Sequence, residues 1–183
     1  ILEETAEIQT GYIMAGFLAD KAGNLKESIA LDLISVIFGE GKSSRLNRKF
    51  IETPEKPHFY QIDTCHYQFK DGDNFFIEAN FEAEFKDVVI SEIRTELDLL
   101  VNITDEELNK AKKRLKVNFA EGAETVSEIA DTIGHYMTVM EDVSLANEYL
   151  NLLSDIDTAY LESVVSKYLT SDKCSISILM PKA

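Results

Sequence analysis

The stretch GKSSRLNRKFIE, residues 41–52, determines how the rest of the chain is interpreted. It follows a run of apolar residues at helical spacing that ends at Gly39. Two serines then precede a second apolar pair, Leu46 and Phe50, which stand four residues apart. Serine favours the position before a helix, and glycine favours the position after one. The stretch therefore predicts that one helix ends at Gly39 and that a second begins after one of the two serines.

The letters GKSS also resemble the end of a phosphate-binding loop, G-x-x-x-x-G-K-[ST]. With Gly41 and Lys42 in register, the first glycine of that motif would fall on Val36. A phosphate loop also follows a strand, whereas this stretch follows a predicted helix. We therefore reject a phosphate-binding role for the segment.

The charge balance excludes several classes of partner. The 183 residues include 33 acids and 18 bases, so the formal net charge is −15. A general nucleic-acid binder would need a basic face, and anionic lipid would repel this chain. No apolar run approaches the ~20 residues of a membrane span. We therefore expect neither nucleic acid nor a membrane as a partner, and we interpret the dispersed acids as a solvated surface.

Four runs of the sequence have the composition of β-strands, and most of the remainder shows helical periodicity. The turn KDGD joins two of these runs, 59–69 and 74–83, into a predicted antiparallel hairpin. The other two runs are 8–19 and 174–180. We expect one mostly antiparallel sheet with the helices packed on one face, which is an α+β fold. Residues 1–183 contain no evident linker or repeat, so a single domain is expected.

Several helix starts are predicted from capping residues. Asn24 with Glu27, and Thr104 with Glu107, have the spacing of a capping box. Asp157 is placed to cap the last helix of the chain. The other helices are predicted at 88–101, 127–140 and 146–153.

Residues that could carry catalysis or bind a metal are scattered. The three histidines fall in a predicted loop (His58), a strand (His66) and a helix (His135), without an H-E-x-x-H or H-x-x-E-H pattern. Cys65 and Cys174 lie in strand-like runs and are expected to be buried free thiols. A disulfide between them is the alternative. We therefore expect no catalytic residue, no metal ligand and no cofactor within this chain.

A family resemblance rests on five motifs in order: YIMAGF, FGEGKSSRLNRKFIE, ITDEELNKAKKRLKVNF, SEIADTIGHYM and DIDTAYLESVVSKYL. Together they resemble the second, non-metal-binding domain of insulinase/pitrilysin-type zinc metallopeptidases. That group includes the mitochondrial processing peptidase and the core subunits of the respiratory bc1 complex. The resemblance spans essentially the whole chain. Each motif alone is only moderately specific, and their order and spacing carry the resemblance.

The resemblance implies a non-catalytic domain that helps to enclose and position a polypeptide substrate. Zinc would lie in a sister domain or subunit on the opposite side of the substrate. The alternative is a catalytically dead subunit of the same fold that only holds an assembly together. A third interpretation is a free-standing binding domain that forms a homodimer through its sheet or its helical face.

The start of the chain affects two further expectations. It begins at Ile1 without a methionine, so we expect it to be a piece of a longer peptidase. No secretory signal is visible, and we expect a cytoplasmic location, with the periplasm as the alternative.

The resemblance also suggests where this chain departs from active members of the family. Those members carry an arginine in an L-R-E motif and a tyrosine shortly after it, whereas the arginine position here is Ile51 and the following loop is longer. Tyr60 is the candidate for the tyrosine in a shifted register, and Arg48 or Lys49 for the missing charge. These residues would contact substrate. Arg45 matches the arginine of S-S-R-L and is expected to pair with a residue inside the domain.

Overall fold

The computed structural model describes residues 1–20, 24–52 and 58–182. One five-stranded sheet has the strand order β1-β5-β2-β4-β3. The strands are β1 (Leu2–Ala6), β2 (Gly11–Leu18), β3 (Phe59–Tyr67), β4 (Asn74–Phe81) and β5 (Ser175–Pro181). All neighbouring strands are antiparallel except β1 and β5, which are parallel. The four predicted strands are therefore confirmed in a single, mostly antiparallel sheet.

Strand β1 was not predicted from the sequence. Its residues, LEETA, are mostly polar and exposed, so they lack the alternation of apolar residues that marks a half-buried strand. Among the described residues, the strand pairs only with β5, at the edge of the sheet. Charged side chains on an edge strand also discourage pairing with other chains.

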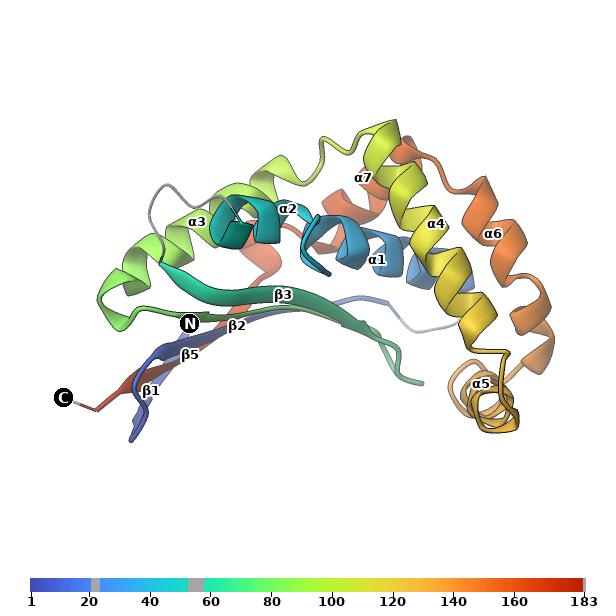
Figure 1. The fold of residues 1–183 in the computed structure, drawn as a ribbon, viewed down its shortest axis with the longest axis horizontal. Coiled ribbons are helices and arrows are strands. Elements are labelled where there is room, and N and C mark those ends of the chain that lie inside the picture. The colour runs from blue at the N-terminus through green and yellow to red at the C-terminus, as the bar shows by residue number, and fades with distance from the viewer. Residues whose placement is uncertain (21–23, 53–57, 183) are drawn as a thin grey trace.

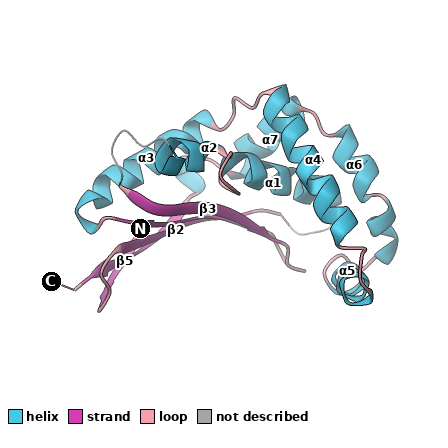
Figure 2. Cartoon of the chain, viewed as in Figure 1, coloured by secondary structure: helices cyan, strands magenta, loops and turns pink. Residues whose placement is uncertain are grey.

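The helices cover one face of the sheet, as predicted (Figures 1 and 2). They are α1 (Leu25–Phe38), α2 (Arg45–Asn47), α3 (Lys86–Leu99), α4 (Asp105–Glu121), α5 (Val126–Thr138), α6 (Tyr149–Asp155) and α7 (Thr158–Tyr168). The predicted second helix of the opening stretch is only the short α2, which continues as a π-helical turn, Arg48–Glu52. The helix predicted at 146–153 is divided into a 3₁₀ turn, Val143–Asn147, and α6.

Helix α1 is the centre of the helical layer. It contacts β3 on one side and α4, α6 and α7 on the other. Its side chains are consequently buried over most of the circumference, including Ile29, Leu33 and Phe38. From the sheet, side chains such as Ile13 and Ile77 alternate into the same core. Each large apolar side chain buried in this way contributes about 1.5–3 kcal/mol to the hydrophobic stabilisation.

Only part of the predicted capping box of α1 forms. The Asn24 side chain accepts a hydrogen bond from the Glu27 backbone nitrogen at 3.3 Å. The Glu27 side chain instead interacts with the ammonium group of Lys167 at 3.0 Å and accepts a hydrogen bond from the Tyr168 hydroxyl at 2.7 Å. A tertiary contact with α7 therefore replaces the second half of the box. Gly39 ends α1 as predicted.

Complete capping boxes start two other helices. The predicted box of Thr104 and Glu107 opens α4. A second one, formed by Thr125 and Glu128, opens α5 and was overlooked in the sequence although its spacing is the same. Asp157 caps α7 as predicted. Within the described ranges, every helix falls short of the length and apolar character that a membrane crossing requires.

Candidate functional site

The face of the sheet opposite the helices is bare over the described residues, and it is concave (Figure 1). Because side chains alternate along a strand, every second residue points to this face. Cross-strand pairing arranges these side chains in rows. One row contains Leu179, Tyr12, Asn80 and Gln61, and the next contains Ser177, Met14, Glu78 and Asp63.

These two rows line a shallow groove of about 380 Å³. Tyr12 and Met14 are exposed and supply apolar surface. Asp63 and Glu78 lie directly opposite each other on neighbouring strands, an arrangement of like charges that costs free energy. The side-chain oxygen of Asn80 is buried and has no hydrogen-bond partner among the described residues. The groove therefore combines apolar side chains with negative charge and with an unused hydrogen-bond acceptor.

Strand β3 forms one edge of the sheet, and Tyr60 lies on it. The pairing register with β4 shifts between Phe59 and Gln61, so Tyr60 is the extra residue of a β-bulge. Bulges re-aim side chains and are common at sheet edges. The Tyr60 ring is exposed, and its hydroxyl donates a hydrogen bond to Glu82, which raises the pKa of the phenol. The role of Tyr60 as the counterpart of the family's tyrosine, and its contact with substrate, stay predictions.

Arg48 lies elsewhere. It is in the π-helical turn after α2 and lines a cavity of about 490 Å³ on the helical side, between α1 and α4. Tyr60 lines neither this cavity nor the groove on the bare face, so the structure does not bring these two candidates together in one described cavity. Ile51, at the position of the family's arginine, packs against the core. Most of the longer loop, residues 53–57, lies outside the described residues.

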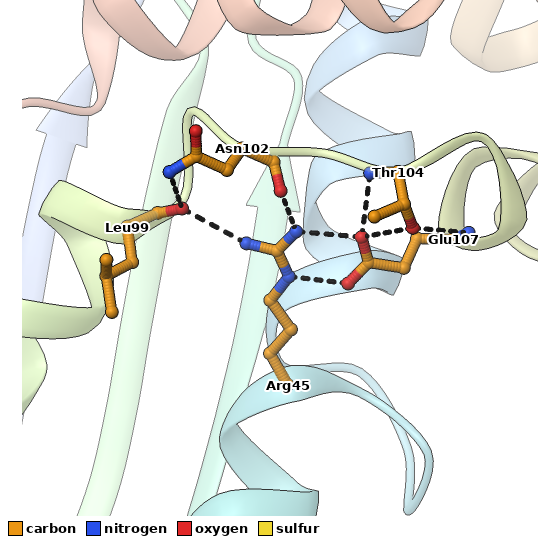
Figure 3. A network of polar contacts seen from close by, with 5 residues as sticks. All are labelled: Arg45, Leu99, Asn102, Thr104 and Glu107. Carbon is orange, nitrogen blue, oxygen red and sulfur yellow. Dashed lines mark hydrogen bonds and ion pairs between the residues drawn. The ribbon is translucent and has the colours of Figure 1, made fainter.

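Arg45 is an internal pairing residue, as predicted (Figure 3). Its guanidinium group binds both carboxylate oxygens of Glu107, at 2.6 and 2.8 Å. It also donates to the backbone oxygens of Asn102 at 2.5 Å and Leu99 at 3.3 Å. The charged hydrogen bond from Arg45, reinforced by hydrogen bonds from Thr104, lowers the pKa of Glu107 to about 2 although partial burial opposes the shift. One side chain thus fixes α2 to the loop between α3 and α4 and to the start of α4.

A buried polar cluster was not foreseen from the sequence. The His66 side chain is 1% exposed, and its Nδ1 lies 2.7 Å from an Asp32 oxygen. Its Nε2 lies 3.2 Å from an oxygen of Asp73, which also accepts a hydrogen bond from the Ser28 hydroxyl. Burial alone would lower the pKa of His66, but the hydrogen bonds to Asp32 and Asp73 outweigh it and raise the pKa to about 9. The protonated ring therefore connects α1 to the hairpin of β3 and β4.

Both cysteines are free thiols, which confirms that part of the prediction. They are half-buried rather than fully buried. Burial raises the pKa of both Cys65 and Cys174, so neither has the depressed pKa of a reactive thiol.

With this geometry established, comparison with known proteins decides the family. Residues 1–115, more than half of the chain, match the family described as the peptidase M16 inactive domain. The chain belongs to this family. The resemblance to the non-metal-binding domain of zinc metallopeptidases is thereby confirmed, whereas the relation to the mitochondrial processing peptidase stays a prediction.

The proteins that this M16 inactive domain resembles include zinc proteases, and several solved structures share its fold. The zinc protease PqqE of Helicobacter pylori is 28% identical over 159 residues, which is 85% of this chain and 35% of that protein. A crystal structure of a protease from Helicobacter pylori has a TM-score of 0.85 at 24% identity, covering 98% of this chain and 44% of that one. An M16 inactive domain from Pseudomonas fluorescens has a TM-score of 0.85 at 17% identity, covering 100% of this chain and 43% of that one. The chain thus spans less than half the length of these relatives.

The histidines of this M16 inactive domain do not fit a zinc site. Both ring nitrogens of His66 face carboxylates, which hold the ring from opposite sides. His135 bonds the side chain of Gln68 at 2.7 Å, and His58 packs its ring against Phe85. Over the described residues, no three His, Cys, Asp or Glu side chains are grouped as metal ligands. No chemical step is therefore assigned to a metal held by these residues.

Proposed function

We propose that this domain forms one wall of an enclosure in which an extended polypeptide is held opposite a zinc-bearing sister domain. The observation that supports this most strongly is the bare, concave face of the sheet. Its groove offers apolar contact from Tyr12 and Met14 and a buried Asn80 oxygen without a partner. Membership of the M16 inactive-domain family and the zinc proteases among the relatives provide the context.

The edge strand β3 gives the polypeptide a second means of attachment. An extended peptide can add to an exposed sheet edge by backbone hydrogen bonds, with alternate side chains read by the sheet face. A peptide placed along β3 would lie beside Asp63 and close to Tyr60. In this proposal the sister domain supplies the zinc, the metal-activated water and the general base, while this domain positions the substrate.

The experiment combines this chain with the separately produced sister half of the protein and measures peptide cleavage. We expect cleavage only from the mixture. The double variant Tyr12→Ser, Met14→Ser should raise KM about tenfold, because roughly 1.4 kcal/mol of apolar contact is lost. Val117→Ser, an exposed apolar residue on α4, is the matched control and should leave KM unchanged. An unchanged KM in the double variant would contradict a role of the bare face in substrate binding.

A catalytically dead assembly subunit is the second candidate. It is favoured by Ile51, which packs an apolar side chain against the core where active relatives are expected to carry an arginine. If the two halves form a stable complex that cleaves no peptide at any ratio, this second function replaces the first.

A further inference from the structure

A cavity of about 360 Å³ lies on the helical side of the domain, where α1, α5, α6 and the end of α4 supply its walls. This size is at the lower end of the range for small-ligand sites. The cavity shares no lining residue with the groove on the bare face or with the cavity beside Arg45. It is therefore separate from the features used in the proposal above.

Three aromatic side chains line this cavity: Phe119, Tyr136 and Tyr149. The rings of Phe119 and Tyr149 stack, with 5.0 Å between their centroids and 6° between their planes. Tyr136 is only 7% exposed, yet its hydroxyl has no hydrogen-bond partner among the described residues. Buried polar groups normally have such a partner. The Tyr136 hydroxyl is therefore a hydrogen-bonding group that the chain itself leaves unused at this cavity.

Two carboxylates line the same cavity, Asp32 from α1 and Asp131 from α5. Asp131 is exposed and has no ion-pair partner within the described part of the chain. Asp32 contacts His66, which it shares with Asp73, so one protonated ring serves two carboxylates and leaves a net charge of −1. Burial, with the negative charge of Asp32, also raises the pKa of Tyr136, which places this carboxylate close to the phenol.

The chain supplies no cation of its own to this cavity. None of the described residues that line it is a lysine or an arginine. The segment from Val117 to Ser166, which forms most of its walls, has ten acidic residues and neither of these cations. Lys70, two positions after the lining residue Gln68, is paired with Glu141 at 2.6 Å. The negative charge of the cavity is therefore left for a cation from outside the chain.

The lining favours an organic cation over a metal ion. Over the described residues, no three His, Cys, Asp or Glu side chains are grouped as metal ligands, and hard cations need several oxygen ligands. An organic cation can lie against aromatic rings. Among such groups, guanidinium is planar, weakly hydrated and rich in hydrogen-bond donors, which suits two carboxylates and a phenol oxygen. The apolar walls of Leu25 and Phe119 suit the methylene groups of an arginine side chain.

We propose that this cavity binds the arginine side chain of a polypeptide. Its guanidinium group donates hydrogen bonds to Asp32 and Asp131 and to the unused hydroxyl oxygen of Tyr136. Its methylene groups contact Leu25 and Phe119. This binding does not rest on the enclosure proposed above, because it requires neither the bare face of the sheet, nor the sister half, nor zinc.

The test titrates the chain with N-acetyl-arginine amide and follows the backbone amide signals by NMR. We expect a dissociation constant on the order of 1 mM, with the shifts concentrated in α5 and α6. N-acetyl-citrulline amide, a neutral analogue of similar shape, should not bind. N-acetyl-lysine amide should bind at least about threefold more weakly, because an ammonium group is more strongly hydrated. Methylguanidine should bind at least about tenfold more weakly, because it lacks the methylene groups that contact the apolar walls.

Three variants separate this cavity from general attraction to an acidic chain. Asp131→Asn should weaken binding of N-acetyl-arginine amide about fivefold, since an exposed ion pair is lost. Asp98→Asn, an exposed acid on α3, is the matched control and should bind like the parent. Tyr136→Phe should weaken binding about threefold. Its unfolding midpoint in urea should stay unchanged, because the hydroxyl that it removes has no partner among the described residues.

Several outcomes would overturn the proposal. Equal binding of the arginine and citrulline compounds would exclude recognition of the charge, and equal binding of the arginine and lysine compounds would exclude recognition of guanidinium. Methylguanidine that binds as tightly as the arginine compound would exclude the side chain of a polypeptide as the occupant. An affinity that is unchanged in both Asp131→Asn and Tyr136→Phe, or the absence of any shift, would exclude this cavity as the site.

Discussion

Single residues in this domain connect segments that are far apart in the chain. Arg45 reaches Glu107, 62 positions later, and His66 bridges Asp32 and Asp73. In both cases a cation is held by carboxylates at a partly or fully buried position. Removal of one partner there leaves the charge of the other unpaired. These contacts stabilise the arrangement of the helical layer on the sheet.

Replacement of Arg45 by alanine should lower stability and leave any peptide binding nearly unchanged. Glu107 would lose its bidentate partner, and two backbone oxygens would lose a donor. A fully buried pair costs about 3–5 kcal/mol to break. The side chains here are 20% and 29% exposed, so we expect about 2–3 kcal/mol. Urea unfolding at constant m-value measures the loss. Arg45→Lys keeps the charge but cannot make the bidentate hydrogen bonds of a guanidinium group, so it should recover only part of the lost stability.

The His66 cluster predicts a loss of stability in mild base. The pKa of His66 is about 9 in the folded domain and about 6.5 for an ordinary histidine, so the folded state favours the protonated ring. This contribution is complete below about pH 6.5 and disappears as the pH rises through about 9, with an upper size of about 3 kcal/mol. Unfolding free energies measured between pH 6 and 10 should show the decline. His66→Gln should be less stable than the parent at pH 6, and its stability should decline less than that of the parent in this window, because only the thiols and phenols whose pKa values are raised in the folded state still contribute. A parallel decline in the variant would assign the effect to other groups.

At the scale of elements, local signals placed most helix ends correctly. Thr104 caps α4, Asp157 caps α7 and Gly39 follows α1, as their residue types predict. The π-helical turn and the break between the 3₁₀ turn and α6 were not predicted from the sequence. Neither contains a proline, and apolar periodicity alone does not reveal them. Most residues of α5 are exposed, so its stability depends more on its ends than on packing.

Removal of the α5 cap should therefore loosen this helix selectively. In Thr125→Ala, the Glu128 backbone nitrogen loses its acceptor at 3.2 Å, which should cost about 1 kcal/mol. Hydrogen exchange of the α5 amides should accelerate about fivefold, while exchange in α1 stays unchanged. Thr138→Ala is the control, because this threonine bonds a carbonyl group of its own helix and caps nothing. Equal acceleration in both variants would argue against the importance of the cap.

At the scale of the whole molecule, the placement of all helices on one face of the sheet decides which surfaces of the domain stay uncovered. Helices occupy one face of the sheet, and the other face and the β3 edge are open in the described structure. The apolar side chains of Val126, Ile129, Ile133 and Met137 on α5 are also exposed. The chain spans less than half the length of the relatives it matches.

We predict that this chain alone binds no stoichiometric zinc and cleaves no peptide. A catalytic zinc site needs about three protein ligands and an open position. His66 is already held by two carboxylates, and His58 and His135 lie in other parts of the fold. Elemental analysis after mild chelation and return of zinc, with a peptide-cleavage assay on the same sample, provides the measurement. One tightly held zinc per chain, or cleavage that a chelator abolishes, would refute the prediction.

The sequence by itself determined the features that depend on neighbouring residues. Strand-like composition specified the four strands β2, β3, β4 and β5, capping residues specified helix starts, and ordered motifs indicated the family. The tertiary structure alone decided the features that depend on distant ones. These include the cluster of His66 with Asp32 and Asp73, the fit of Gly39 where a Cβ would lie 2.5 Å from the Thr64 side chain, and the pairing of β1. Periodicity shows which side chains of α5 share a face. Whether that face is buried depends on what packs against it, and only the folded chain shows that Ile129, Ile133 and Met137 are exposed.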